Sequence, residues 1–168
     1  SDYFLQAPDI RVAEQKVSFG TSGHRGNASK LSFNQHHIEA ICQAVAEYRQ
    51  KQGFQGPLYL GKDTHALSEP AFATAIEVLV ANNVPVVIQA DDGFTPTPVI
   101  SRLIIVHNKT QKTQADGLII TPSHNPPTDG GIKYNPPHGG PAEGEITQVI
   151  EQRANEIIAN KLVDVKRI

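Results

Sequence analysis

The sequence predicts an α/β fold, a three-layer domain with a mixed, mostly parallel central sheet flanked by helices. Two observations lead to this prediction. Short apolar runs rich in β-branched residues, such as residues 84–90 and 115–121, are typical of buried strands. Segments with apolar residues at helical spacing separate these runs, and such alternation favours a largely parallel sheet. A chain of 168 residues is long enough for a single domain with its own core.

The predicted elements follow an irregular lead-in over residues 1–16. The predicted strands lie in residues 16–20, 57–61, 84–90 and 115–121. The predicted helices lie in residues 31–53, 68–83, 92–108 and 143–161. Gly53 suits a helix end, Ser68 suits an N-cap, and a Thr-Pro pair suits the start of the third helix. Residues 130–142 are expected to form a loop.

Composition and charge exclude several classes of function. A formal charge of −2 gives no general attraction to nucleic acid or to an acidic membrane, so any anion site has to be local. The longest apolar runs are far too short to span a bilayer. The single Cys42 rules out an internal disulfide and a cysteine-based zinc site, which fits a cytoplasmic protein. Cys42 is expected to be a small buried helix residue, whereas His36 and His37 are expected at the surface.

The chemically interesting side chains fall in loops that follow predicted strands. In an α/β sheet, the loops at the carboxyl ends of the strands form the ligand crevice. This rule selects the loops GTSGHRG, GKDT, DDGFTP and TPSHNPP. Together with the lysine of GGIKYN, two of these loops supply a hydroxyl, an imidazole, a guanidinium and an ammonium group. The set suits phosphoryl transfer, in which positioning and charge neutralisation dominate.

Each of these residues also has an ordinary structural interpretation. Ser123 and His124 stand between prolines that limit the direction of a nucleophilic hydroxyl, yet Ser, Asn and Pro are common in turns. Arg25 lies among glycines whose N–H groups can converge on an anion, but a glycine-rich turn with a solvated arginine looks the same. Lys133 can neutralise phosphate charge or move a proton, although a lone lysine is usually solvated. Asp63 or Ser68 is expected to cap the helix that follows.

Two motifs resemble a known family. TPSHNPPTDGGIKYN resembles the phosphoserine loop of the α-D-phosphohexomutase superfamily, and FGTSGHRG resembles the amino-terminal loop of its phosphoglucomutases. Both motifs occur in the family's order, and the resemblance covers essentially the whole chain. TPSHNPP with GGIKYNPPHGGPA is more similar to the bacterial α-D-glucose phosphoglucomutases than to the phosphomannomutase or phosphoglucosamine mutase branches.

The resemblance implies a role for each site residue. Ser123 would carry a phosphoryl group, give it to a glucose phosphate to form glucose 1,6-bisphosphate, and take back the other phosphate. Mg²⁺ would contact the phosphoryl oxygen on Ser123. His124 would position the phosphoserine or the sugar, and Arg25 and Lys133 would bind the phosphoryl group, with Lys133 also a candidate acid–base group. Thr21 would join the substrate-binding residues.

The resemblance also implies that further domains belong to the same polypeptide. Family members have four domains, and residues 1–168 correspond to the first one, so we expect a single α/β domain that cannot complete a mutase cycle alone. The expected partners are hexose phosphates and the remaining domains, with no nucleic acid and no membrane. Three alternatives stay open: a mutase for another hexose phosphate, such as a phosphomannomutase; a non-catalytic phosphosugar-binding domain; and a serine hydrolase, which no G-x-S-x-G motif supports.

Overall fold

The computed structural model describes residues 2–20 and 22–168, and within these residues five strands form one sheet. The strands are β1 (His24–Asn27), β2 (Leu58–Lys62), β3 (Val86–Val87), β4 (Asp116–Ile120) and β5 (Asp129–Asn135), and their order across the sheet is β1-β5-β4-β2-β3. β2 is parallel to β3 and β4, whereas β5 is antiparallel to β4 and β1. Only β5 therefore runs against the other strands of the described chain, which confirms the predicted mixed, mostly parallel sheet.

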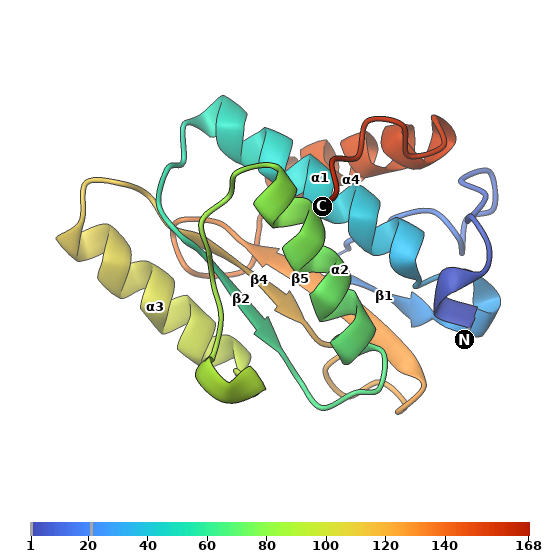
Figure 1. The fold of residues 1–168 in the computed structure, drawn as a ribbon, viewed down its shortest axis with the longest axis horizontal. Helices are drawn as coiled ribbons and strands as arrows, with labels where there is room; N and C mark the ends of the chain where they lie inside the picture. The colour runs from blue at the N-terminus through green and yellow to red at the C-terminus, as the bar shows by residue number, and fades with distance from the viewer. Residues whose placement is uncertain (1, 21) are drawn as a thin grey trace.

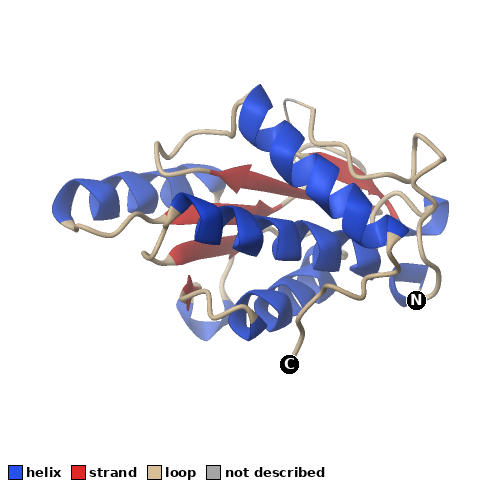
Figure 2. Cartoon of the chain, turned by 90° about the horizontal axis from the view of Figure 1, so that it is seen from above, coloured by secondary structure: helices blue, strands red, loops and turns tan. Residues whose placement is uncertain are grey.

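Helices cover both faces of the sheet (Figure 1, Figure 2). The α-helices of the described residues are α1 (Gln35–Gln52), α2 (Ser68–Ala81), α3 (Thr97–Thr110) and α4 (Gly144–Ala159), with 3-10 turns η1 (Asp2–Phe4), η2 (Ala28–Lys30) and η3 (Ala90–Asp92). α3 packs on one face against β2 and β4, while α2 contacts the other face and α1 packs against both α2 and α4. This is the predicted three-layer arrangement. No helix in residues 2–20 and 22–168 combines the length and apolar character needed to cross a membrane.

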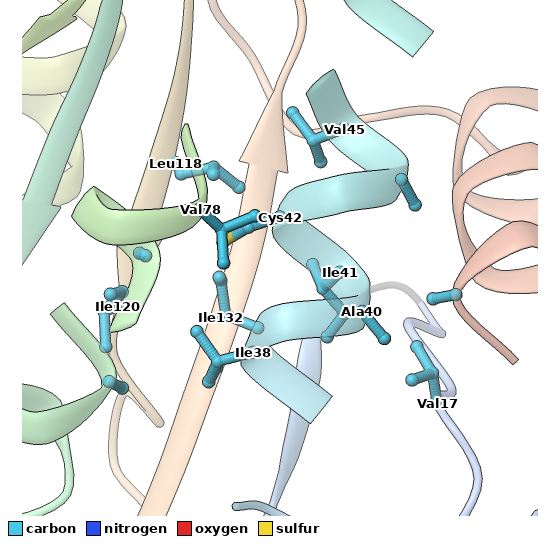
Figure 3. Packing of buried hydrophobic residues seen from close by; sticks show 14 of the residues in the cluster. Val17, Ile38, Ala40, Ile41, Cys42, Val45, Val78, Leu118, Ile120 and Ile132 are labelled. Carbon is cyan, nitrogen blue, oxygen red and sulfur yellow. The ribbon is translucent and has the colours of Figure 1, made fainter. Parts of the chain in front are cut away.

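Side-chain alternation along the central strands separates two cores. Leu60 of β2 and Leu118 of β4 point into a large cluster shared with α1 and α2, part of which Figure 3 shows. Ile119, the residue directly after Leu118 in β4, faces the other side of the sheet and packs with Ile100 and Ile104 of α3. Successive side chains of a strand point to opposite faces, so β4 has to be apolar along its whole length. This requirement explains why the apolar run of β4 is easily recognised in the sequence as a buried strand.

Local signals set both ends of α1. Asn34 precedes the helix and accepts hydrogen bonds from the N–H groups of His36 and His37. The ring of His37 accepts one from the N–H of Asn34, which completes a capping box. Gly53 ends the helix at φ +74°, a left-handed conformation that glycine adopts without strain. His37 is fully buried, so its predicted surface position is wrong, while Cys42 is buried as predicted.

Three predicted elements differ in the structure. Residues 129–135 form β5 instead of a loop, because Ile132 and Tyr134 alternate with smaller or polar residues and pack in the core. The strand expected at residues 16–20 lies further along the chain, at β1, where it pairs with β5. The buried strand expected over residues 84–90 is wrong in length and in burial: it shortens to β3, which pairs with β2 at the sheet edge, and Val87 and Ile88 are exposed because no further strand of the described chain covers them.

Two predicted helix caps also differ. Ser68 is the first residue of α2, Leu67 occupies the N-cap position, and the Ser68 hydroxyl donates to Asp63 Oδ1 at 2.6 Å. Pro96 precedes α3 in place of a threonine, and Pro98 falls in the first turn, where no backbone N–H is needed. Asp63 does not accept a hydrogen bond from the first-turn N–H groups of α2, so it belongs to the loops at the strand ends.

Candidate functional site

The carboxyl ends of β2 and β4 lie side by side at the same end of the sheet, because the two strands are parallel neighbours. Asp63 follows β2 and Thr121 follows β4. The loop before α3 lies at the same end of the sheet, where the N–H of Thr95 donates a hydrogen bond to the backbone of β2. These loops line a cavity of about 410 Å³. Ser123 and His124 lie on its wall, so the predicted crevice is where the strand-end rule places it.

Ser123 has a left-handed backbone conformation within its turn. Its φ is +56°, which costs a residue other than glycine about 1 kcal/mol. The N–H of Ser123 donates a hydrogen bond to Thr121 Oγ1 at 2.9 Å. The N–H of Asn125 donates to the carbonyl of Pro122 at 3.2 Å and closes the turn. Together these bonds hold the half-buried Ser123 side chain in place.

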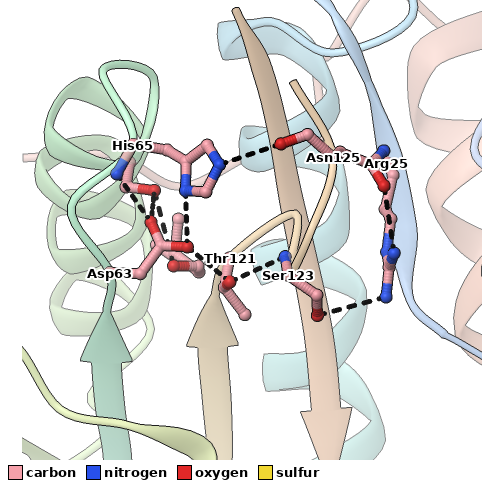
Figure 4. A network of polar contacts seen from close by, with 8 residues as sticks. Arg25, Asp63, His65, Thr121, Ser123 and Asn125 are labelled. Atoms are coloured by element: carbon pink, nitrogen blue, oxygen red, sulfur yellow. Dashed lines mark hydrogen bonds and ion pairs between the residues drawn. The ribbon is translucent and has the colours of Figure 1, made fainter. Parts of the chain in front are cut away.

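Arg25 reaches Ser123 from β1, as Figure 4 shows. Its Nη2 donates to Ser123 Oγ at 3.2 Å, and its Nη1 donates to Asn125 Oδ1 at 3.2 Å. The antiparallel register pairs Arg25 with Gly131 of β5, which lies directly against the turn: a Cβ at Gly131 would be 2.4 Å from the carbonyl oxygen of Thr121. The sheet therefore brings together two predicted site residues that are 98 positions apart in the chain.

The other predicted site residues take different positions. Lys133 lies on β5 two residues beyond the partner of Arg25, so both side chains project from the same face of the sheet. Burial lowers the pKa of Lys133, and the positive charge of Arg25 lowers it further. His124 is exposed at the cavity wall, and Thr21 lies outside the described residues.

A network beside the turn contains residues to which sequence reasoning assigned no catalytic role (Figure 4). Asp63 accepts hydrogen bonds from Thr121, Ser68 and His65. Burial acts to raise the pKa of Asp63, but these bonds outweigh burial and hold the pKa below its ordinary value. The Nε2 atom of His65 also contacts the carbonyl oxygen of Asn125 at 3.2 Å. The one signal available in the sequence was the position of Asp63 directly after a strand.

Among the described residues, the side chains around Ser123 do not form a metal site by themselves. Across residues 2–20 and 22–168, no group of three or more His, Cys, Asp or Glu side chains could hold a metal ion. The carboxylate of Asp63 has both oxygens engaged in hydrogen bonds. A phosphoryl group on Ser123 would add hard oxygen atoms of the kind that Mg²⁺ prefers. Those oxygens fit a magnesium ion better than the carboxylate does.

Comparisons with known proteins converge on one family. Residues 16–161 match the family model described as phosphoglucomutase/phosphomannomutase, alpha/beta/alpha domain I. The phosphoglucomutase of Komagataeibacter xylinus is 56% identical over 167 residues, which cover 99% of this chain and 30% of that protein. Phosphoglucomutase 1 of Saccharomyces cerevisiae is 29% identical over 159 residues, which cover 93% of this chain and 27% of that protein.

A solved structure shares the fold. Exocytosis-sensitive phosphoprotein pp63/parafusin, a phosphoglucomutase from Paramecium in its open form, superimposes with a TM-score of 0.73 at 27% identity. The match covers 90% of this chain and 27% of that chain. In these comparisons the chain spans no more than 30% of the length of its relatives.

Proposed function

Because this chain belongs to the phosphoglucomutase and phosphomannomutase family, in which it corresponds to the α/β/α domain I, we propose that it is the phosphoserine domain of a phosphoglucomutase. The complete enzyme would interconvert glucose 1-phosphate and glucose 6-phosphate through glucose 1,6-bisphosphate. The contact between Arg25 Nη2 and Ser123 Oγ carries the proposal, because it sets a permanent cation against the oxygen that would bear the phosphoryl group. The high similarity to a phosphoglucomutase over almost the whole chain favours glucose over another hexose.

The phosphoryl group would move between two oxygen atoms. A hydroxyl oxygen of the sugar phosphate attacks phosphorus, the bond between phosphorus and Ser123 Oγ breaks, and the sugar becomes a bisphosphate. Oγ takes up a proton, and after reorientation the bisphosphate returns its other phosphoryl group to Oγ by the reverse step. Arg25 would stabilise the negative charge on Oγ and on the phosphoryl oxygens during each transfer.

Lys133 would move the proton. Its lowered pKa means that the ammonium group gives up a proton more readily than a solvated lysine does. The neutral amine can accept the proton of the attacking hydroxyl, and the ammonium can return it to Oγ. His124, exposed at the cavity wall, would position the phosphoserine or the sugar, and Thr21 would join the substrate-binding residues.

The remaining parts of the site would come from outside these residues. Mg²⁺ would bind through a phosphoryl oxygen on Ser123, and when bound it would share the charge of that group. Other domains of the same polypeptide would complete the sugar site, so this chain alone would not isomerise a hexose phosphate. We place the enzyme in the cytoplasm, and the buried, free thiol of Cys42 is compatible with a reducing compartment.

Phosphopeptide mapping tests the proposal. The full-length polypeptide that carries this chain is incubated with glucose 1,6-bisphosphate and Mg²⁺ and then digested. We expect phosphate on the peptide that contains Ser123, loss of that phosphate on adding excess glucose phosphate, and no phosphate in the Ser123→Ala variant. An unmodified Ser123 peptide from folded protein would overturn the proposal and favour a non-catalytic phosphosugar-binding domain.

A further inference from the structure

We propose that Asp63 is a positioning residue that holds the turn around Ser123 from both sides. The inference rests on the proposed function, because it concerns how the phosphate-carrying serine is aimed. Asp63 contacts the two neighbours through which it would act, Thr121 and His65, as Figure 4 shows. Thr121 links its carboxylate to the turn on one side, and His65 links it to Asn125 on the other.

The first link is a directed chain of two hydrogen bonds. The Thr121 hydroxyl donates to Asp63 Oδ2 at 2.5 Å, and Thr121 Oγ1 accepts the N–H of Ser123 at 2.9 Å. An ionised carboxylate has no proton to donate, so the hydroxyl proton of Thr121 has to point to Asp63. This leaves a lone pair on Oγ1 for the N–H of Ser123. The chain thus supports the left-handed conformation of Ser123, which would otherwise relax.

The second link runs through the ring of His65. Its Nδ1 lies 2.9 Å from Asp63 Oδ2, and its Nε2 lies 3.2 Å from the carbonyl oxygen of Asn125. These two contacts set the ring between the carboxylate of Asp63 and the backbone of the turn. The backbone N–H of His65 and the hydroxyl of Ser68 also donate to Asp63 Oδ1, at 2.9 Å and 2.6 Å, and fix the orientation of the carboxylate.

The turn is therefore held between two charged groups, Arg25 on β1 and Asp63 in the loop after β2. Arg25 contacts Ser123 and Asn125 through their side chains, whereas the Asp63 network contacts the backbone of the same two residues. Loss of the Asp63 network leaves Arg25 in place but lets the Ser123 backbone shift. A shift of this kind changes the alignment of Oγ for transfer and leaves the binding of a hexose phosphate largely intact.

Isosteric substitution tests the first link in the full-length polypeptide. Thr121→Val removes the hydroxyl and keeps the shape, so we expect kcat to fall at least about tenfold, with KM within about twofold. Thr121→Ser restores the hydroxyl and should bring kcat to within about threefold of the parent. Thr74→Val removes another buried, hydrogen-bonded hydroxyl, whose partners are the Tyr3 hydroxyl and the Pro70 carbonyl, and should leave kcat unchanged. A parental kcat in folded Thr121→Val would overturn the inference.

Asp63→Asn tests the carboxylate itself, because it keeps the shape and removes the charge. We expect the same loss of kcat as in Thr121→Val, and a parental kcat would overturn the inference. Amide hydrogen exchange at Ser123 separates this inference from the proposed function, since it needs no turnover. Exchange should be at least about tenfold faster in Thr121→Val than in Thr121→Ser, even if no phosphate is ever found on Ser123. Equal exchange rates would overturn the inference whatever the enzyme does.

Discussion

The rings of His24 and His37 stack in the core with their centroids 4.9 Å apart, and both side chains are buried. His24 belongs to β1, where its ring faces the same core as α1. Because strand side chains alternate between faces, the next side chain, Arg25, points to the opposite face and meets Ser123. The stacked ring of His24 and the site arginine thus lie on opposite faces of the same strand.

Acid should destabilise the domain through these two rings. Burial lowers the pKa of His24 to about 4 and that of His37 to about 3, from an ordinary value of about 6.5. The unfolded chain binds more protons than the folded chain from about pH 6.5 down to about pH 4 for His24 and about pH 3 for His37. The free energy of unfolding therefore keeps its full value above about pH 6.5 and falls as pH decreases through this window. Urea denaturation should give a free energy of unfolding lower by about 2 kcal/mol per histidine at pH 5 than at pH 7.

The variant His24→Gln provides the control for this pH dependence. It removes one of the two titrating rings, so it should lower stability at pH 7 and roughly halve the slope of stability against pH. A free energy of unfolding that stays level in the parent chain between pH 7 and pH 5 would contradict the assignment of buried, neutral rings.

Arg25→Lys should slow phosphoryl transfer although it keeps the positive charge. Lysine has no planar fork, so it cannot contact Ser123 and Asn125 together. We expect kcat of the full-length polypeptide to fall about 100-fold, the scale of losing one preorganised donor. Arg11→Lys is the matched control, because Arg11 is an exposed arginine paired with Asp9, and it should keep the parental rate. Steady-state kinetics would refute the role of Arg25 if both variants matched the parent.

Ser123→Gly and Ser123→Ala should separate chemistry from backbone conformation. Both variants lose the hydroxyl, so neither should be phosphorylated. At φ +56° alanine retains the left-handed strain that glycine relieves, and we expect the glycine variant to be more stable by about 1 kcal/mol. Thermal denaturation of the two variants side by side measures the difference. If the alanine variant were the more stable one, the turn would not be left-handed in solution.

The pKa of Lys133 should respond to the charge of Arg25. Burial lowers this pKa first and the guanidinium lowers it further, so Arg25→Gln should raise it part of the way back to the ordinary value for lysine. The pH dependence of amine labelling at Lys133, followed by mass spectrometry in the parent chain and the variant, checks this. Superimposable labelling curves would show that the two cations do not interact.

The elements that could be predicted from sequence are those with strong local patterns. α1, α2 and α4 carry apolar residues at helical spacing, and β4 is apolar throughout because both of its faces are covered. The sequence predicts a loop where β5 lies, because the glycines of β5 weaken the local strand signal. Its glycines are required by close neighbours: a Cβ at Gly130 would lie 2.3 Å from the ring of Phe33, and Phe33 is distant in the sequence.

The sequence by itself determined the fold class, the crevice loops and the serine turn, because strand–helix alternation, prolines and glycines act over a few residues. Only the tertiary structure decided which side chains meet in that crevice. The register of β1 against β5 sets Arg25 beside Ser123, and the parallel pairing of β2 with β4 sets Asp63 beside Thr121. These are pairings between distant segments. Their geometry depends on how a whole sheet assembles, which no local pattern of residues records.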